Sequence, residues 1–142
     1  NLCDLTSADL GAVEAAITDE CIFKRVRHCI TENERVLAAV AALKAGDLPK
    51  LGELLKASHD SLRRDYEVTG LELDTLADAA NAERGCLGAR MTGAGFGGCA
   101  IALVQKDAVA EFTVRVGNAY TEKTGLTASF FACEAGNGAR RV

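Results

Sequence analysis

The segment over residues 93–98 constrains this chain most, because it places four glycines within six residues and is followed at once by an apolar run over residues 99–104. Its Gly-x-Gly-x-x-Gly spacing matches the dinucleotide-binding pattern, but that pattern must open a helix. Here the run that follows is short and rich in residues that favour strands. No Lys-Ser or Lys-Thr pair follows the last glycine, which excludes a P-loop. The sequence therefore predicts a hairpin, in which the glycines join a strand over residues 87–92 to the strand over residues 99–104.

The same glycines could form a binding site made of backbone alone. Glycine permits positive φ angles and the close approach of a ligand or another loop, and successive N–H groups in such turns can surround an anion. A phosphate or a neighbouring loop is therefore the expected partner of residues 93–98, and Arg90 is the basic side chain beside them. A glycine-rich hairpin that binds nothing remains an equal alternative from this segment alone, because such glycine strings are weak signals.

Apolar residues recur at helical spacing on both sides of the hairpin. Gly46 is expected to end a long helix, Asp47 to cap the next one, and Pro49 to lie in its first turn, where a missing N–H costs nothing. Thr69 and Glu72 have the spacing of a capping box. The expected helices cover residues 6–17, 19–45, 48–66, 69–80 and 107–124, and a last strand covers residues 127–133.

This order of elements predicts the α+β class, with an antiparallel sheet and helices packed on one face. Asp107 is expected to cap the last helix and Gly125 to end it. The tail over residues 136–141 is expected to be loose. One apolar stripe is expected along the long helix, formed by Val26, Cys29, Ile30, Val36, Leu37, Val40 and Leu43.

Length and composition favour one ordinary globular domain over residues 1–142. The net charge of −4 argues against nucleic acid and against an anionic membrane surface, since both favour basic patches. No apolar run approaches the roughly 18 residues that a membrane span needs. No signal peptide is visible, and a chain that starts at Asn1 without methionine is expected to be a fragment or a processed product.

The six cysteines show no Cys-x-x-Cys pair and no zinc-type histidine spacing, so we expect no metal site and predict buried free thiols in a reducing cytoplasm. They are Cys3, Cys21, Cys29, Cys86, Cys99 and Cys133.

The two histidines suggest catalysis only superficially. His28 and Glu32 are four residues apart on one helical face, which more often marks a solvated or interhelical hydrogen-bonding pair than an acid and base. His59 lies among charged residues and is expected to belong to a charged face and helix cap, with a role facing an active site as the lesser alternative. Arg63, Arg64 and Arg90 could each meet a phosphate. No catalytic residue is assigned.

Residues 91–99 resemble the third conserved motif of the GHMP small-molecule kinases, and Phe96 within the glycines resembles the galactokinase branch of that family. Residues 25–35, 58–68 and 125–133 resemble the same branch, so the likeness runs through nearly the whole chain in the family's order. It departs at residues 69–71, where the family usually carries a proline, which leaves the local turn undefined.

The resemblance implies the ferredoxin-like C-terminal domain of these kinases, truncated at its N-terminal edge. It implies ATP and Mg²⁺ as cofactors, galactose as substrate, and a cytoplasmic enzyme whose sugar-binding motif, Ser-rich phosphate loop, catalytic aspartate and supporting arginine lie in a missing N-terminal region. A kinase acting on N-acetylgalactosamine and a non-catalytic sugar sensor with a protein partner remain alternatives. The residues implied to brace the phosphate end of the site are Gly93, Ala94, Gly95, Phe96, Gly97 and Gly98.

If a strand is missing, the chain should expose a strand edge. The apolar helical faces around Leu37, Leu51 and Leu62 should then be partly uncovered.

Overall fold

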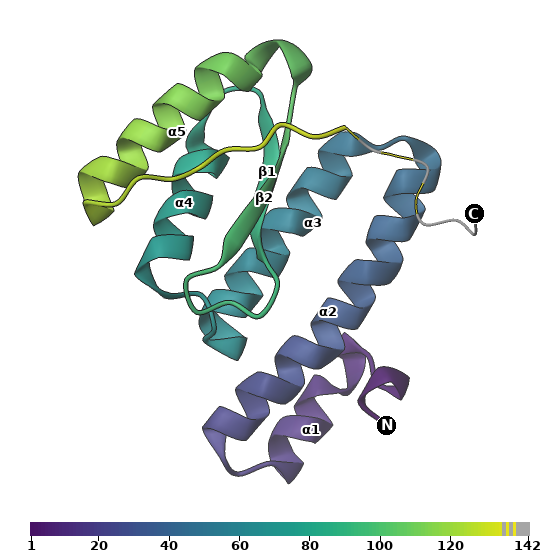
Figure 1. Cartoon of the computed structure of the whole chain (residues 1–142). Helices are drawn as coiled ribbons and strands as arrows, with labels where there is room; N and C mark the ends of the chain where they lie inside the picture. The colour runs from purple at the N-terminus through teal and green to yellow at the C-terminus, as the bar shows by residue number, and fades with distance from the viewer. Residues whose placement is uncertain (135, 137, 139–142) are drawn as a thin grey trace.

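A computed structural model describes residues 1–134, 136 and 138 (Figure 1). The helices are α1 (Leu10–Ala16), α2 (Glu20–Ala45), α3 (Leu48–Ser61), α4 (Gly70–Ala82) and α5 (Val109–Thr124), and the strands are β1 (Cys86–Thr92) and β2 (Cys99–Val104). Four short helical turns are η1 (Leu2–Asp4), η2 (Ser7–Asp9), η3 (Leu62–Tyr66) and η4 (Lys106–Ala108), of which η3 is a π-helical turn. The hairpin lies between the α4–α5 pair and the α2–α3 pair, which confirms an α+β fold with helices packed against an antiparallel sheet. The helices cover both sides of the hairpin and not one face as expected, because Gly88 of β1 faces α3 whereas its neighbour Ala89 faces α4 and α5.

Most predicted helix ends are confirmed by their capping groups. The Asp19 carboxylate accepts a hydrogen bond from the N–H of Ile22 at 3.0 Å, and α2 ends at Gly46. Asp47 accepts from the N–H of Lys50 at 3.0 Å, and Pro49 lies in the first turn of α3.

Two predicted caps are wrong. Thr69 precedes α4, but its backbone is already helical, with φ −87° and ψ −64°, so its side chain caps no helix N–H. Against the opposing effect of burial, Thr69 instead helps Arg63 to lower the pKa of the Asp74 carboxyl. Asp107 lies inside η4, and Ala108 occupies the capping position of α5.

The core has two clusters, both built on one face of β1. Ala89 packs with Ala80 of α4 and with Phe112 and Val116 of α5. Met91 packs with Leu62 and Leu73. Burial of this face therefore fixes α4 and α5 against the hairpin.

The backbones of α3 and β1 touch through two glycines. A Cβ atom added at Gly52 would lie 2.2 Å from the carbonyl oxygen of Leu87, and one added at Gly88 would lie 2.1 Å from that of Gly52. Neither position has room for a side chain, so this contact sets the distance between α3 and the hairpin.

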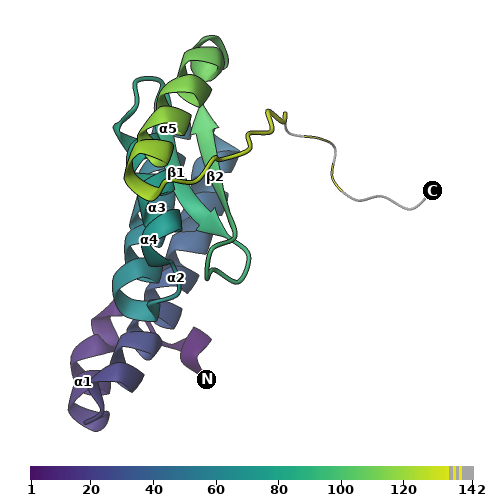
Figure 2. The same ribbon diagram turned by 60° about the vertical axis from the view of Figure 1, so that its left-hand side comes forward.

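The last predicted strand is wrong. Residues 126–134 are described but belong to no strand, and they lead away from α5 along the yellow part of the chain in Figure 2. Phe130 lies against Gly117 of α5, whereas Phe131 is 87% exposed. A β-compatible sequence becomes a strand only where a ladder partner faces it, and no described residue provides one. The loose tail predicted for residues 136–141 falls mostly outside the described residues.

The apolar stripe of α2 is buried only at Ile30 and half-buried at Val26. Ile30 is fully buried, but Leu37 is 64% exposed, and Val36, Val40 and Leu43 are also exposed. The expected uncovering of Leu37 is therefore confirmed. Leu51 is half-buried, which agrees with the expected partial uncovering. Leu62 is buried by the second core cluster, so the expectation is wrong at Leu62.

The two outer edges of the hairpin differ in what covers them. On β1, the N–H and C=O of Ala89 bond the side chain of Asn81 at 2.8 and 3.1 Å, and the N–H of Met91 donates to Nδ1 of His59 at 3.1 Å. Within the described part of the chain, β2 pairs with β1 alone, and its Ile101 is about half exposed. Only β2 therefore offers an open edge to another strand.

We expect the isolated 142-residue chain to self-associate through β2. A two-stranded sheet is marginal, and an open apolar edge templates pairing with other chains. Sedimentation at several concentrations should show association, and Ile101→Lys should reduce it because a charge on an edge strand opposes pairing. Val114→Lys, at an exposed position on α5, should not reduce the association. A wild-type chain that stays monomeric at every concentration would contradict the prediction.

Candidate functional site

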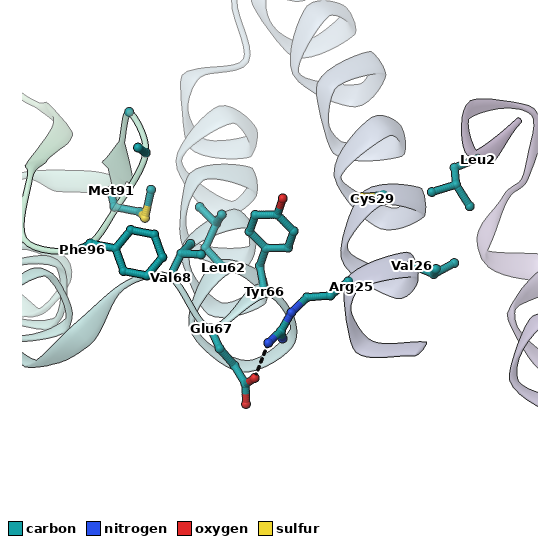
Figure 3. A pocket seen from close by; sticks show the side chains of 12 residues that line it. Leu2, Arg25, Val26, Cys29, Leu62, Tyr66, Glu67, Val68, Met91 and Phe96 are labelled. Atoms are coloured by element: carbon teal, nitrogen blue, oxygen red, sulfur yellow. Dashed lines mark hydrogen bonds and ion pairs between the residues drawn. The ribbon is translucent and has the colours of Figure 1, made fainter. Parts of the chain in front are cut away.

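Residues 93–98, which we call the glycine loop, form one wall of an open hollow of roughly 800 Å³ (Figure 3). Leu62, Tyr66, Val68 and Met91 form its apolar floor, with Phe96 at the loop end. The remaining lining residues are Leu2, Arg25, Val26, Cys29, Glu67, Gly93 and Ala94.

The loop follows a backbone path that favours glycine. Gly93, Gly95 and Gly97 have φ angles of +81°, +87° and +90°, and Phe96 shares the left-handed region at +58°. A Cβ atom at Gly95 would lie 2.1 Å from the carbonyl oxygen of Val68, whereas nothing lies within 4 Å of one at Gly93 or Gly97. The loop thus combines one very close contact with two open positions.

Val68 also holds the loop by a hydrogen bond. The N–H of Phe96 donates to the carbonyl oxygen of Val68 at 2.8 Å, while the Phe96 ring is 79% exposed. That N–H is therefore committed within the protein and cannot serve an anion. The segment that approaches Gly95 is a neighbouring turn, one of the two partners that the sequence predicts.

The turn that carries Val68 has an unusual backbone of its own. The π-helical turn η3 is followed by Glu67 in the left-handed region, at φ +58°. Arg25 holds this turn, because it donates to the backbone oxygen of Asp65 and pairs with Glu67 at 2.6 Å, as the dashed line in Figure 3 marks. The Arg25 guanidinium lowers the pKa of the Glu67 carboxyl. Irregular helical turns of this kind are frequent at functional sites.

Arg90 is bonded within the protein, and its Nε donates to the carbonyl oxygen of Met91 at 2.8 Å, so a role toward a phosphate stays a prediction. Its Nη1 atom lies 3.1 Å from Oε1 of Glu32, which also pairs with Arg35 at 2.7 Å and accepts from the hydroxyl of Ser58. Burial raises the pKa of Glu32, but Ser58 and the two guanidinium groups outweigh it and hold the pKa below its usual value. This cluster joins α2, α3 and β1.

His28 is confirmed as an interhelical hydrogen-bonding residue. Its Nδ1 lies 3.0 Å from the hydroxyl of Ser61, and its ring stacks on Tyr66 with centroids 4.7 Å apart. Burial lowers the pKa of His28, although the Glu32 carboxylate opposes the shift.

His59 does not lie on a charged face, so that prediction is wrong. Its side chain is buried. Its Nδ1 accepts a hydrogen bond from the N–H of Met91 at 3.1 Å, and its Nε2 lies 3.2 Å from Oδ1 of Asp74. Arg63 shares that carboxylate at 2.9 Å. Burial and then the Arg63 charge lower the pKa of His59, against the opposing effect of Asp74. No local pattern in the sequence signals this contact, because His59 and Met91 come from different elements.

The two buried histidines predict that the folded chain loses stability in mild acid. Their pKa values lie below about 6.5, the value in an unfolded chain, so the unfolded state binds more protons as the pH falls through that value. The free energy of unfolding should then fall by at most about 1.4 kcal/mol per pH unit for each histidine. Asp74 and Asp78 face His59 and reduce the effect, while Arg63 increases it.

Denaturant unfolding at about pH 7.5 and about pH 5.5 measures this loss. His59→Asn should remove its share of the pH dependence. Equal stability at both pH values would contradict the prediction.

The described residues contain no group of three or more His, Cys, Asp or Glu side chains placed to hold a metal ion. None of the described helices is both long and apolar enough to cross a membrane. The cysteines are free, as predicted, but not buried: Cys86 is half-buried and the other five are exposed. Their exposure follows from their positions on uncovered helix faces, the open β2 strand and the terminal segments.

The family described as "GHMP kinases C terminal" matches residues 39–122 of this chain. A galactokinase from Fusobacterium nucleatum is 52% identical over 98% of this chain and 36% of its own length. A galactokinase from Exiguobacterium sibiricum is 58% identical over 87% of this chain and 32% of its own. The crystal structure of Lactococcus lactis galactokinase complexed with galactose superposes with a TM-score of 0.90 at 55% identity, over 92% of this chain and 34% of that one. The chain thus spans about a third of the length of these relatives.

Proposed function

Because the chain belongs to the GHMP kinase family, through the C-terminal domain of that family, we propose that it is the C-terminal part of a galactokinase. The intact protein would transfer the γ-phosphoryl group of ATP to the 1-hydroxyl of galactose. The curated relatives named galactokinase support this proposal, as does the likeness to the galactose-bound Lactococcus lactis enzyme.

The observation that carries a role for this chain is the way Val68 holds the glycine loop, through a hydrogen bond from the N–H of Phe96 and a close approach to Gly95. Phosphoryl transfer depends mainly on positioning and on stabilising charge, with little covalent chemistry for the protein to perform. A loop held at Gly95 and Phe96, with open space at Gly93 and Gly97, is suited to brace a phosphate or the phosphate-binding loop of another domain. We assign residues 93–98 this supporting role and no bond-making step.

ATP and Mg²⁺ would be bound mainly by residues outside this chain. The N–H of Phe96 supports this assignment, because it is already bonded to Val68 and cannot serve a phosphate. Mg²⁺ would neutralise the developing charge on the phosphates. Residues 1–142 would act as one domain packed against the N-terminal domain, and the free thiols favour a reducing cytoplasm.

The test is a coupled ADP-release assay on the intact protein, with galactose, with N-acetylgalactosamine and without sugar. Galactose-dependent turnover is the expected result. Preference for N-acetylgalactosamine would reassign the sugar. Galactose binding in calorimetry without turnover would overturn the enzyme proposal and favour a sugar sensor.

A further inference from the structure

The continuous segment from α3 through η3 to Val68 bonds the hairpin at two places, at the base of the glycine loop and within it. His59 of α3 accepts the N–H of Met91, two residues before the loop begins at Gly93. Beyond the π-helical turn, the same segment presents the carbonyl oxygen of Val68 to the N–H of Phe96. The loop is therefore attached near its base and at Phe96, within the loop, to a single continuous stretch of chain.

The His59 ring is held in one protonation state by its partners. The N–H of Met91 can only donate, so Nδ1 must be the accepting, unprotonated nitrogen. The proton then lies on Nε2, which faces Oδ1 of Asp74 at 3.2 Å. Arg63 fixes that carboxylate at 2.9 Å and pairs with Asp78 at 2.7 Å. The ring is 2% exposed, so water does not replace these contacts.

Met91 connects His59 to the glycine loop, which begins two residues later. Its side chain is 2% exposed and packs on Leu62 and Leu73, and it forms part of the floor of the hollow. The bond from His59 satisfies a backbone N–H on the edge of β1 that faces away from β2. Without it, this buried donor would be left unpaired.

We propose that His59 is a positioning residue of the kinase, which sets the glycine loop through the N–H of Met91. The inference rests on the proposed function, because the loop matters for catalysis only if it braces the phosphate end of the site. His59 does not touch substrate in this arrangement. It acts by fixing where β1 ends and the loop begins.

Two substitutions test separately the roles of the two ring nitrogens of His59. In His59→Asn, the side-chain oxygen occupies the place of Nδ1 along the side chain and can still accept the N–H of Met91. In His59→Gln, the side-chain nitrogen occupies the place of Nε2 and can still reach Asp74, but no acceptor remains for Met91. The proposal predicts that the intact His59→Gln enzyme loses at least about tenfold in kcat with a smaller change in KM, because small misplacements of a site can cost up to about a hundredfold. His59→Asn should recover most of that loss.

Val116→Ala controls for lost stability. Val116 is buried in α5 and touches neither the loop nor His59. This variant should unfold more easily than wild type with kcat unchanged. Equal losses of kcat in His59→Asn and His59→Gln, or losses that track stability as in Val116→Ala, would overturn the proposal.

A readout independent of turnover keeps the proposal separate from the kinase assignment. Hydrogen–deuterium exchange over residues 91–98 of the intact protein should be faster in His59→Gln than in wild type and nearly normal in His59→Asn. Nitrogen-15 NMR of wild type should show Nδ1 unprotonated and Nε2 protonated, with the His59→Asn spectrum assigning the signal. If neither variant folds, the opposite tautomer in wild type overturns the proposal and the expected one supports it. A wild-type protein without kinase activity would refute the proposed function but leave these two measurements decisive for the attachment.

Discussion

Replacing Gly95 with valine in the intact protein is expected to lower kcat/KM at least tenfold while leaving the fold largely in place. The backbone at Gly95 has a φ of +87°, and a side chain there would lie 2.1 Å from the carbonyl oxygen of Val68. Strain of this kind costs about 1–3 kcal/mol, and about 1.4 kcal/mol corresponds to a factor of ten in rate. The loop must move away from Val68, and the hydrogen bond from Phe96 should be lost with it.

Gly46→Val is the matched control for this experiment. Gly46 also has a left-handed backbone, with φ +69°, but nothing lies within 4 Å of a Cβ added there, and it ends α2 away from the loop. It should cost stability without changing kcat/KM. Steady-state kinetics and circular dichroism on both variants decide the outcome. Wild-type kinetics in a well-folded Gly95→Val protein would mean that the loop is only a hairpin.

The 142-residue chain alone is expected to show no galactose-dependent release of ADP. It spans about a third of the length of its relatives. From the resemblance, we expect the catalytic aspartate and the phosphate loop in the part that it does not cover. Phosphoryl transfer needs the nucleophile, the phosphates and the metal held together, and one supporting loop cannot do this.

The measurement is a coupled assay on the purified chain, with the intact protein at the same concentration as positive control. Intact protein diluted stepwise into the assay sets the detection limit. Turnover by the chain above a buffer blank, and dependent on galactose, would refute the prediction and place catalytic groups within residues 1–142.

Local sequence patterns predict the helices and the hairpin well. Asp19, Gly46 and Asp47 mark helix ends because capping depends on atoms only a few residues apart. The glycines of residues 93–98 mark the hairpin for a similar reason, since positive φ is a local requirement. These features need no knowledge of the rest of the chain.

Features that depend on distant partners escape such patterns. Residues 127–133 have the composition of a strand but lack a ladder partner among the described residues. His59 stands among charged neighbours in sequence, yet its partners Met91 and Asp74 draw it into the interior. The contact of Val68 with Gly95 likewise joins segments that no periodicity relates. The loop could therefore be located from the sequence, but the residues that hold it could not.

The backbone contact between Gly52 and Gly88 has a consequence for how this gene can tolerate variation. Neither glycine lines the hollow, and each has backbone atoms where a methyl group would have to go. A substitution at either position would push α3 away from β1, and α3 carries His59 and leads into the turn that ends at Val68. Missense changes at these two positions should thus disturb the fold and, under the proposed function, the kinase activity, although a geneticist who mapped only ligand-facing residues would classify both as neutral.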